Sequence, residues 1–181
     1  MKNIAIIGMG HLGKALFKGL INSNEIKLIL NTENKVIRIM PNIPIAVCKG
    51  VIGAYQSVQD VTNIIQKLGI VIEVADELML DLITIIGGCG PGIVAYLMNI
   101  LVDISIEKGF SKPDASRIAQ QLFDGTSKYI ADSKITPNEM ACKVATKGGN
   151  TESIINYYDE IELKREIYAG FALGLNKLQK Y

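Results

Sequence analysis

The chain has 181 residues, of which 49% are hydrophobic and 20% charged, with 19 Lys and Arg against 18 Asp and Glu. The net charge of +1 argues against a general nucleic-acid binder, and the composition excludes a disordered chain and allows a sizeable core. We expect no membrane span and no signal peptide. Three widely spaced cysteines favour neither disulfides nor a metal site, so we expect a cytoplasmic protein.

The first 76 residues carry the pattern of an α/β domain. Lys2–Gly8 is a short apolar run typical of a buried parallel strand, and His11–Ile21 follows with apolar residues at helical spacing. Further strands are expected over Ile26–Leu30, Val36–Met40, Ala46–Tyr55 and Ile70–Val74, and a helix over Val58–Leu68.

After Asp76 only helices are expected. They cover Glu77–Ile86, Gly92–Lys108, Lys112–Ala131, Pro137–Ala145, Thr151–Asp159 and Glu160–Lys180, with glycine and proline at most of the breaks. The second and third helices are largely apolar, as at Leu97 and Leu122, which favours burial against a second chain. We predict a dinucleotide-binding domain over residues 1–76, a helical domain over 77–181, and at least a homodimer.

A glycine turn lies between the first strand and the first helix. Gly8, Gly10 and Gly13 form a G-x-G-x-x-G, which allows a tight turn, close approach to a pyrophosphate and close helix packing. We therefore predict a dinucleotide site here that also includes His11 and Leu12, the alternative being a purely structural turn. His11 is the only histidine, and we expect it to be an exposed first-turn residue rather than a metal ligand.

The residues after the second predicted strand leave the choice of nicotinamide cofactor open. Asn31, Thr32 and Lys35 favour NADP, because neutral or basic groups tolerate its extra phosphate. Glu33 favours NAD, because an acidic group can bind the ribose hydroxyls.

Three further motifs follow in a fixed order: R-I-M-P-N-I-P over Arg38–Pro44, G-G-C-G-P over Gly87–Pro91, and V-A-T-K-G-G-N-T over Val144–Thr151. With the glycine turn, they resemble the pyrroline-5-carboxylate reductase family, whose patterns are R-x-M-P-N-x-P, S-G-S-G-P and V-x-S-P-G-G-x-T. The resemblance implies an α/β fold class: a truncated Rossmann-like domain followed by an all-α dimerisation and substrate domain. It also implies reduction of 1-pyrroline-5-carboxylate to L-proline, with NADP as cofactor or NAD as the alternative.

The resemblance implies the site residues as well. It places Met40, Pro41 and Asn42 beside the nicotinamide. Against the substrate it places Cys89, Gly90, Thr146, Gly148, Gly149, Asn150 and Thr151, with Thr151 as the catalytic residue. Such a loop suits a small anionic substrate, because backbone N–H groups and a hydroxyl can bind its carboxylate. Reduction of a cyclic imine then depends mainly on orientation and exclusion of water.

Six residues depart from the family pattern. Thr146 replaces Ser and keeps its hydroxyl, and Gly87 and Ile93 replace Ser and Tyr beside the third motif. Lys147 replaces Pro and is either a solvated lysine or a direct partner for the substrate carboxylate. Cys142 replaces Asp, which removes a local polar contact. Cys89 replaces Ser, and we expect it to be a small packing residue rather than a reactive thiol.

The chain is also shorter than the family pattern between Leu30 and Val36. Five residues stand there in place of further strand–helix units, each of which takes about 30 residues. Two alternatives to the reductase therefore stay open. One is a non-catalytic relative, or an internally deleted member, that keeps the helical module for dimerisation or interaction. The other is a different reductase of the same superfamily with another small carboxylated substrate.

Overall fold

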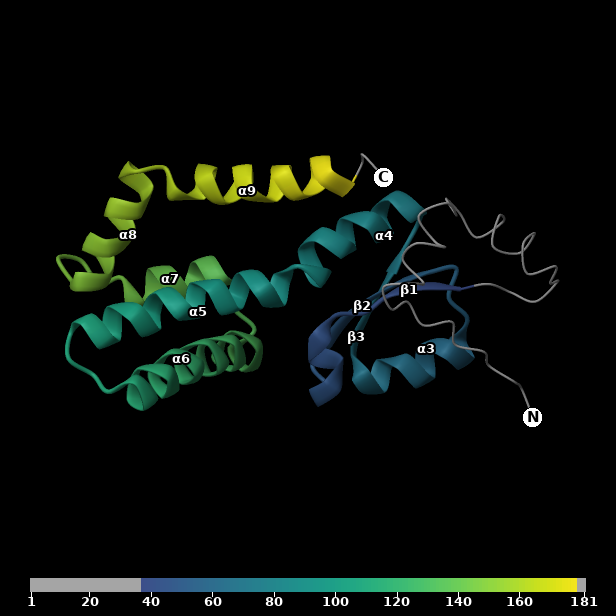
Figure 1. Ribbon diagram of the computed structural model, residues 1–181, viewed down its shortest axis with the longest axis horizontal. Helices are drawn as coiled ribbons and strands as arrows, with labels where there is room; N and C mark the ends of the chain where they lie inside the picture. Colours follow the sequence, from purple (N-terminus) through teal and green to yellow (C-terminus); the bar gives the residue numbers. More distant parts are fainter. Residues whose placement is uncertain (1–36, 179–181) are drawn as a thin grey trace. The chain divides into compact units, whose positions relative to one another are not determined.

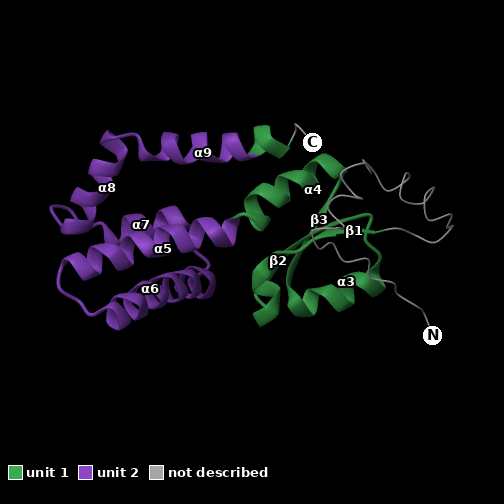
Figure 2. Ribbon diagram, in the orientation of Figure 1, with its two compact units in different colours: residues 1–89, 175–181 green, residues 90–174 purple. Residues whose placement is uncertain are grey.

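The computed structural model describes residues 37–178. The chain divides into two compact units (Figure 2): unit 1 comprises residues 1–89 and 175–181, and unit 2 comprises residues 90–174. The predicted glycine turn, the strands Lys2–Gly8 and Ile26–Leu30 and the helix His11–Ile21 lie outside the described residues. The predicted domain boundary between residues 76 and 77 stays a prediction.

Unit 1 contains a small sheet with the strand order β1 (Arg38–Met40), β2 (Gly50–Tyr55) and β3 (Gly69–Val74) (Figure 1). β1 runs antiparallel to β2, and β2 runs parallel to β3. The helix α3 (Gln59–Ile65) with its short extension η2 (Gln66–Leu68) makes the crossover that two parallel strands require. The carboxyl end of β1 and the amino ends of β2 and β3 therefore lie at the same edge of the sheet.

The predicted strand Ala46–Tyr55 begins later than expected. Its first residues belong to the 3-10 helix η1 (Ile43–Val47), because Pro44 in the first turn favours a helical start. Cys48 ends this helix in the left-handed region, at φ 57°. The prediction of strand at Ala46 and Val47 is therefore wrong, whereas the strand over residues 50–55 is confirmed.

Gly50 and Gly69 face each other where β2 and β3 begin. Gly69 has φ +151°, and a Cβ atom added there would lie 2.0 Å from the Gly50 carbonyl oxygen. Only glycine fits this close approach of the two backbones. The pair therefore sets the point at which the two parallel strands meet.

The core of unit 1 fills both faces of β2. On one face Ile52 and Ala54 are buried with Ile65 of α3, and Ile45, Val61 and Val71 pack around them. The other face carries α4 (Glu77–Ile83), which begins at Asp76, whose side chain accepts a hydrogen bond from the Met79 N–H at 2.8 Å. A Cβ atom at Gly53 would lie 2.9 Å from side-chain atoms of Leu80 and Ile83, so glycine lets α4 lie close to the sheet.

One long helical run follows, from α4 through η3 (Thr84–Gly88) to α5 (Gly90–Glu107). The part called η3 is a π-helical turn rather than α-helix. By length and composition this run, Glu77–Glu107, is able to cross a membrane, and 17% of its most apolar stretch is buried. The expectation of no membrane span stays a prediction. Length and composition alone do not place a helix in a membrane, because the core helix of a soluble protein can share both properties.

Unit 2 is entirely helical within the part that the structure describes. α5 and α6 (Lys112–Ser133) pack side by side, with Ala115 and Ala119 buried (Figure 1). α7 (Pro137–Val144), α8 (Asn150–Glu160) and α9 (Leu163–Leu178) follow, and the last residues of α9 belong to unit 1. The predicted helix start at Thr136 is confirmed: Thr136 and Glu139 form a reciprocal capping box.

Candidate functional site

The loop of the second motif, residues 40–42, leaves β1 at its carboxyl end. Asn42 is half-buried there, and its side chain contacts two other segments of unit 1. Its Nδ2 donates a hydrogen bond to the Gly87 carbonyl at 2.9 Å, and its Oδ1 accepts one from the Val51 N–H at 2.9 Å. The amide side chain thus joins the loop to β2 and to the third motif, 45 residues away.

The third motif lies in the π-helical turn between α4 and α5. The Cys89 N–H donates to the Thr84 carbonyl at 3.1 Å, which closes this turn, and Cys89 itself is exposed. A Cβ atom at Gly88 would lie 2.9 Å from Met40 Cε, so the second and third motifs approach each other closely. Within unit 1 the structure therefore brings together Met40, Asn42 and the turn that leads to Cys89.

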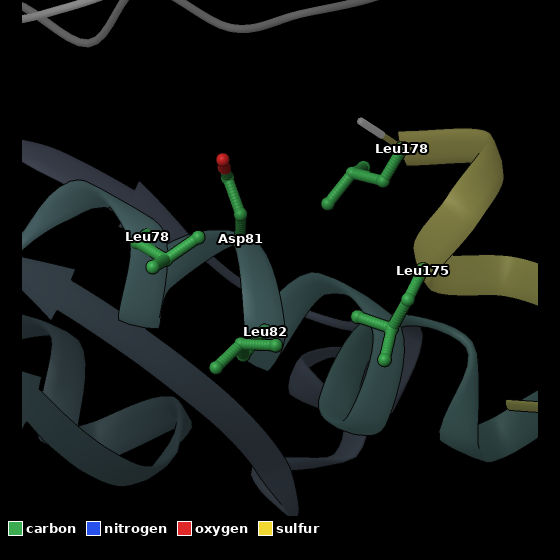
Figure 3. A pocket seen from close by; sticks show the side chains of 5 residues that line it. All are labelled: Leu78, Asp81, Leu82, Leu175 and Leu178. Carbon is green, nitrogen blue, oxygen red and sulfur yellow. The ribbon is translucent and has the colours of Figure 1, made fainter. Parts of the chain in front are cut away.

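Charged residues of α4 lie beside the start of β1. Arg38 Nη1 donates to Glu77 Oε2 in a half-buried ion pair. Burial raises the pKa of the Asp81 carboxyl, while the nearby Arg38 lowers it and Glu77 raises it further. Asp81 lines a pocket of about 40 Å³ together with Leu78, Leu82, Leu175 and Leu178 (Figure 3). This pocket is far smaller than a usual ligand site of about 300 Å³ or more.

A second, more open pocket of about 400 Å³ lies at the amino ends of β2 and β3. It is lined by Cys48, Lys49, Gly50, Val51, Gln66, Gly69 and Ile70. Neither pocket includes a residue that the sequence predicts to bind substrate or cofactor. The predicted site residues therefore lie outside both pockets.

The glycine loop of the fourth motif precedes α8 in unit 2. Gly148 has φ +73°, and Gly149 is the N-cap of the helix. The Gly148 N–H donates to Glu152 Oε2 at 2.7 Å, and the Gly149 N–H donates to the Thr146 carbonyl at 2.8 Å. The Asn150 and Thr151 N–H groups lie in the first helical turn, where no helical carbonyl can accept from them.

Two contacts in these segments were not predicted from the sequence. One is the hydrogen bond that the Glu152 carboxylate accepts from the Gly148 N–H. The sequence feature that could have predicted it is an acidic residue in the first turn of a helix, because such side chains often accept from preceding N–H groups. The other is the bond from Asn42 to Gly87.

The predicted site residues that the structure describes belong to two different units. Met40, Pro41, Asn42 and Cys89 belong to unit 1, whereas Gly90 and the residues Thr146, Gly148, Gly149, Asn150 and Thr151 belong to unit 2. The cofactor residues Gly8, Gly10, His11, Leu12 and Gly13 lie outside the described residues. The roles assigned to all of them stay predictions.

Comparison with known proteins identifies relatives along most of the chain. Residues 77–179 match the family described as pyrroline-5-carboxylate reductase dimerisation. A pyrroline-5-carboxylate reductase from Aquifex aeolicus is 28% identical over 158 residues, which cover 80% of this chain and 59% of that protein. One from Staphylococcus haemolyticus is 31% identical over 140 residues, covering 74% and 51%. The chain thus spans roughly half the length of these relatives.

Solved structures show the same fold. A pyrroline-5-carboxylate reductase from Coxiella burnetii matches with a TM-score of 0.80 at 22% identity, over 88% of this chain and 62% of that one. A Plasmodium falciparum pyrroline carboxylate reductase with NADP bound matches with a TM-score of 0.77 at 22% identity, over 88% and 66%. The predicted fold class, a truncated Rossmann-like domain followed by a helical domain, is confirmed.

Proposed function

The chain belongs to the pyrroline-5-carboxylate reductase family, and from that premise we propose that it reduces 1-pyrroline-5-carboxylate to L-proline with NADPH. NAD is the alternative cofactor, because the sequence leaves that choice open. The reaction transfers a hydride to the carbon of a cyclic imine. The protein has to hold the two reactants together and exclude water.

The observation that carries this proposal is the junction of the second and third motifs through Asn42. One of these motifs is predicted to lie beside the nicotinamide and the other beside the substrate. They are joined by one hydrogen bond of 2.9 Å, from the half-buried Asn42 side-chain amide to the Gly87 carbonyl. Hydride transfer requires such fixed geometry, since small displacements of the reacting atoms cost large factors in rate.

The glycine loop before α8 supports a substrate with a carboxylate. The Gly148 N–H already holds a carboxylate oxygen, that of Glu152, at 2.7 Å. The Asn150 and Thr151 N–H groups and the Thr151 hydroxyl lie in the adjoining first turn of α8, whose dipole favours an anion. We propose that these groups, with Thr146, bind the substrate carboxylate, and that Thr151 is the catalytic residue. Lys147 is exposed beside them, and its two interpretations stay open.

The described part of the cofactor site is the loop after β1. It follows β1 directly, and the family pattern of the second motif predicts a nicotinamide cofactor beside it. Met40 and Pro41 are the residues that would hold the nicotinamide there, and the bound cofactor would supply the hydride. The glycine turn of residues 8–13 would hold the pyrophosphate.

We propose further that the protein is a homodimer at least and acts in the cytoplasm. Apolar side chains of unit 2 are exposed along α5, such as Leu97 and Ile100, each 40% exposed. A second copy of the chain would cover them. Cys48, Cys89 and Cys142 are all free and exposed, which suits a reducing compartment.

The runner-up function is a non-catalytic dimerisation module. It is favoured by the five residues that stand between Leu30 and Val36 where the family pattern has further strand–helix units. The chain spans 59% of its Aquifex aeolicus relative. The same apolar helices would then serve assembly alone. Calorimetry of NADPH binding separates the two functions, because a module without a cofactor site would show no heat of binding.

The test of the reductase is the loss of absorbance at 340 nm when the purified chain is mixed with NADPH and 1-pyrroline-5-carboxylate. We expect turnover, and a drop in kcat/KM of about tenfold or more for Thr151→Val, which removes one hydroxyl. Ser153→Ala is the matched control, because it removes a hydroxyl that bonds only the Gly149 carbonyl in the same helix turn. Absence of turnover with both NADPH and NADH would refute the proposal.

A further inference from the structure

The third motif leaves one carbonyl without its helical partner. In a continuous helix the Gly87 carbonyl would accept from the backbone nitrogen of residue 91. That residue is Pro91, which has no N–H. Asn42 supplies the missing donor, since its Nδ2 lies 2.9 Å from the Gly87 oxygen. The proline of one motif thus creates an acceptor that the asparagine of the other motif satisfies.

The second bond of Asn42 extends the sheet beyond β1. The pairing of Arg38 with Tyr55 and of Met40 with Gly53 places Asn42 opposite Val51, two residues further along. Because Pro41 interrupts the strand, the Asn42 side-chain oxygen accepts from the Val51 N–H in place of a backbone carbonyl. The loop is therefore tied to the sheet and to the π-helical turn by the same side chain.

The π-helical turn is the segment at which unit 1 gives way to unit 2. It covers Thr84–Gly88, and the division between the units falls between Cys89 and Gly90. The bond from the Cys89 N–H to the Thr84 carbonyl is the one that closes the turn. A side chain that holds Gly87 therefore holds the last part of unit 1 before the substrate half begins.

We propose that Asn42 is a positioning residue, which fixes the loop beside the nicotinamide to the start of the substrate half through the Gly87 carbonyl. It acts through that backbone group rather than by direct contact with either reactant. As a statement about catalysis, the inference rests on the proposed function. The packing of the three segments is independent of it.

Two substitutions separate the two bonds of this side chain. Asn42→Asp keeps the acceptor for the Val51 N–H but replaces the donor to Gly87 with a carboxylate oxygen that repels the carbonyl. Asn42→Leu removes both bonds at similar volume. The matched control is Asn63→Leu, because Asn63 is exposed on α3 and its side chain accepts only from Gln59.

We expect kcat to fall about tenfold for Asn42→Asp and further for Asn42→Leu, because the reacting groups lose their alignment. The KM of each substrate and the Kd of NADPH should stay within about threefold of the native values, since binding contacts are kept. Hydrogen exchange gives a readout that needs no turnover. The Cys89 N–H should exchange about tenfold faster in both variants, and the Val51 N–H only in Asn42→Leu.

The outcomes are distinguishable. A native kcat in both variants, or unchanged exchange of the Cys89 N–H, overturns the inference. So does a tenfold weaker Kd for NADPH with unchanged exchange, which would make Asn42 a direct cofactor ligand. If the native chain shows no turnover, the proposed function fails, and exchange at Cys89 decides the inference alone. If Asn42→Leu does not fold, the milder Asn42→Asp decides.

Discussion

The two units bury their apolar residues in different ways. Among the described residues, five of the seven buried apolar side chains lie in unit 1: Ile52, Ala54, Ile65, Leu80 and Ile85. The two in unit 2 are Ala115 and Ala119, which pack the α5–α6 pair closely but bury little area. Unit 1 therefore has a core of its own, whereas unit 2 has helices without one.

Unit 2 differs from unit 1 in the apolar side chains that it exposes. Large apolar side chains are exposed on several of its helices, among them Val94, Leu97, Ile100, Ile104, Leu122, Ile154, Tyr157, Ile167 and Leu173. Since hydrophobic burial is the main source of stability, the proposed homodimer would stabilise these helices by covering them. We therefore expect the stability of unit 2, unlike that of unit 1, to depend on assembly, and residues 77–179 match a dimerisation family.

The largest expected effect is the loss of unit 2 when a charge enters this surface. Leu97→Asp places a carboxylate in the proposed dimer interface, which costs about 3 kcal/mol or more when the charge has no partner. We expect light scattering to give the mass of one chain instead of two. Circular dichroism should show loss of much of the helical signal.

The control lies on the same helix. Asn99 donates to Asp103 at 2.8 Å, so Asn99→Lys adds a charge that finds a partner four residues away. It should leave the dimer intact. In the native chain the unfolding of unit 2 should also shift with protein concentration, while that of unit 1 should not. A monomeric native chain with stable helices would contradict the comparison.

The next largest effect should fall on unit 1 alone. Gly69→Ala forces a Cβ atom to 2.0 Å from the Gly50 carbonyl, at a φ of +151° that side chains rarely adopt. We expect a loss of about 3 kcal/mol or more of stability, because backbone has to move against backbone. Denaturant unfolding followed in both units should show the sheet lost first. Gly92→Ala, where added atoms meet open space, is the control.

Much of this organisation could be predicted from local patterns. Helix starts at Ser111 and Thr136 follow from a capping residue with proline close behind it, and both are present. The alternation of apolar residues predicted β3 correctly except for its first residue, Gly69. The later start of β2 was not predicted, because the apolar residues before Gly50 are compatible with a short helix as well as with a strand. Pro44 in the first turn favours the helix.

The contacts that organise the site could not be predicted in the same way. Asn42 and Gly87 are 45 residues apart, and no periodic pattern links them. The local signal was only that Pro91 leaves a carbonyl without a helical donor. Which side chain supplies that donor depends on how α4 packs on the sheet, and packing is a tertiary property. The motifs predicted two segments of the site, but not the bond that joins them.

A smaller effect is expected at the start of α7 in unit 2, where Thr136 and Glu139 form the capping box. The Thr136 hydroxyl accepts from the Glu139 N–H at 3.1 Å, and the Glu139 carboxylate accepts from the Thr136 N–H at 2.6 Å. Thr136→Ala removes half of this capping box and should cost about 1 kcal/mol. We expect thermal unfolding to show the loss in the helical transition only. A change confined to the sheet transition would contradict the division into units.

The smallest effect is expected from Asp81, a charged residue on α4 in unit 1. Burial raises the folded-state pKa of Asp81 above an unfolded value of about 3.9, against the opposing influence of Arg38. The folded chain therefore holds this proton more tightly than the unfolded chain. The resulting stability is present below the unfolded pKa and is lost as pH rises through the folded pKa.

At pH 7 the ionised carboxylate destabilises unit 1, so Asp81→Asn should raise its melting temperature. The rise should be only about 1–2 °C, because solvent screens a half-buried group. It should disappear at about pH 2, well below the unfolded pKa, where Asp81 is neutral in both states. An equal gain at both pH values would mean that shape, rather than charge, limits the packing of α4.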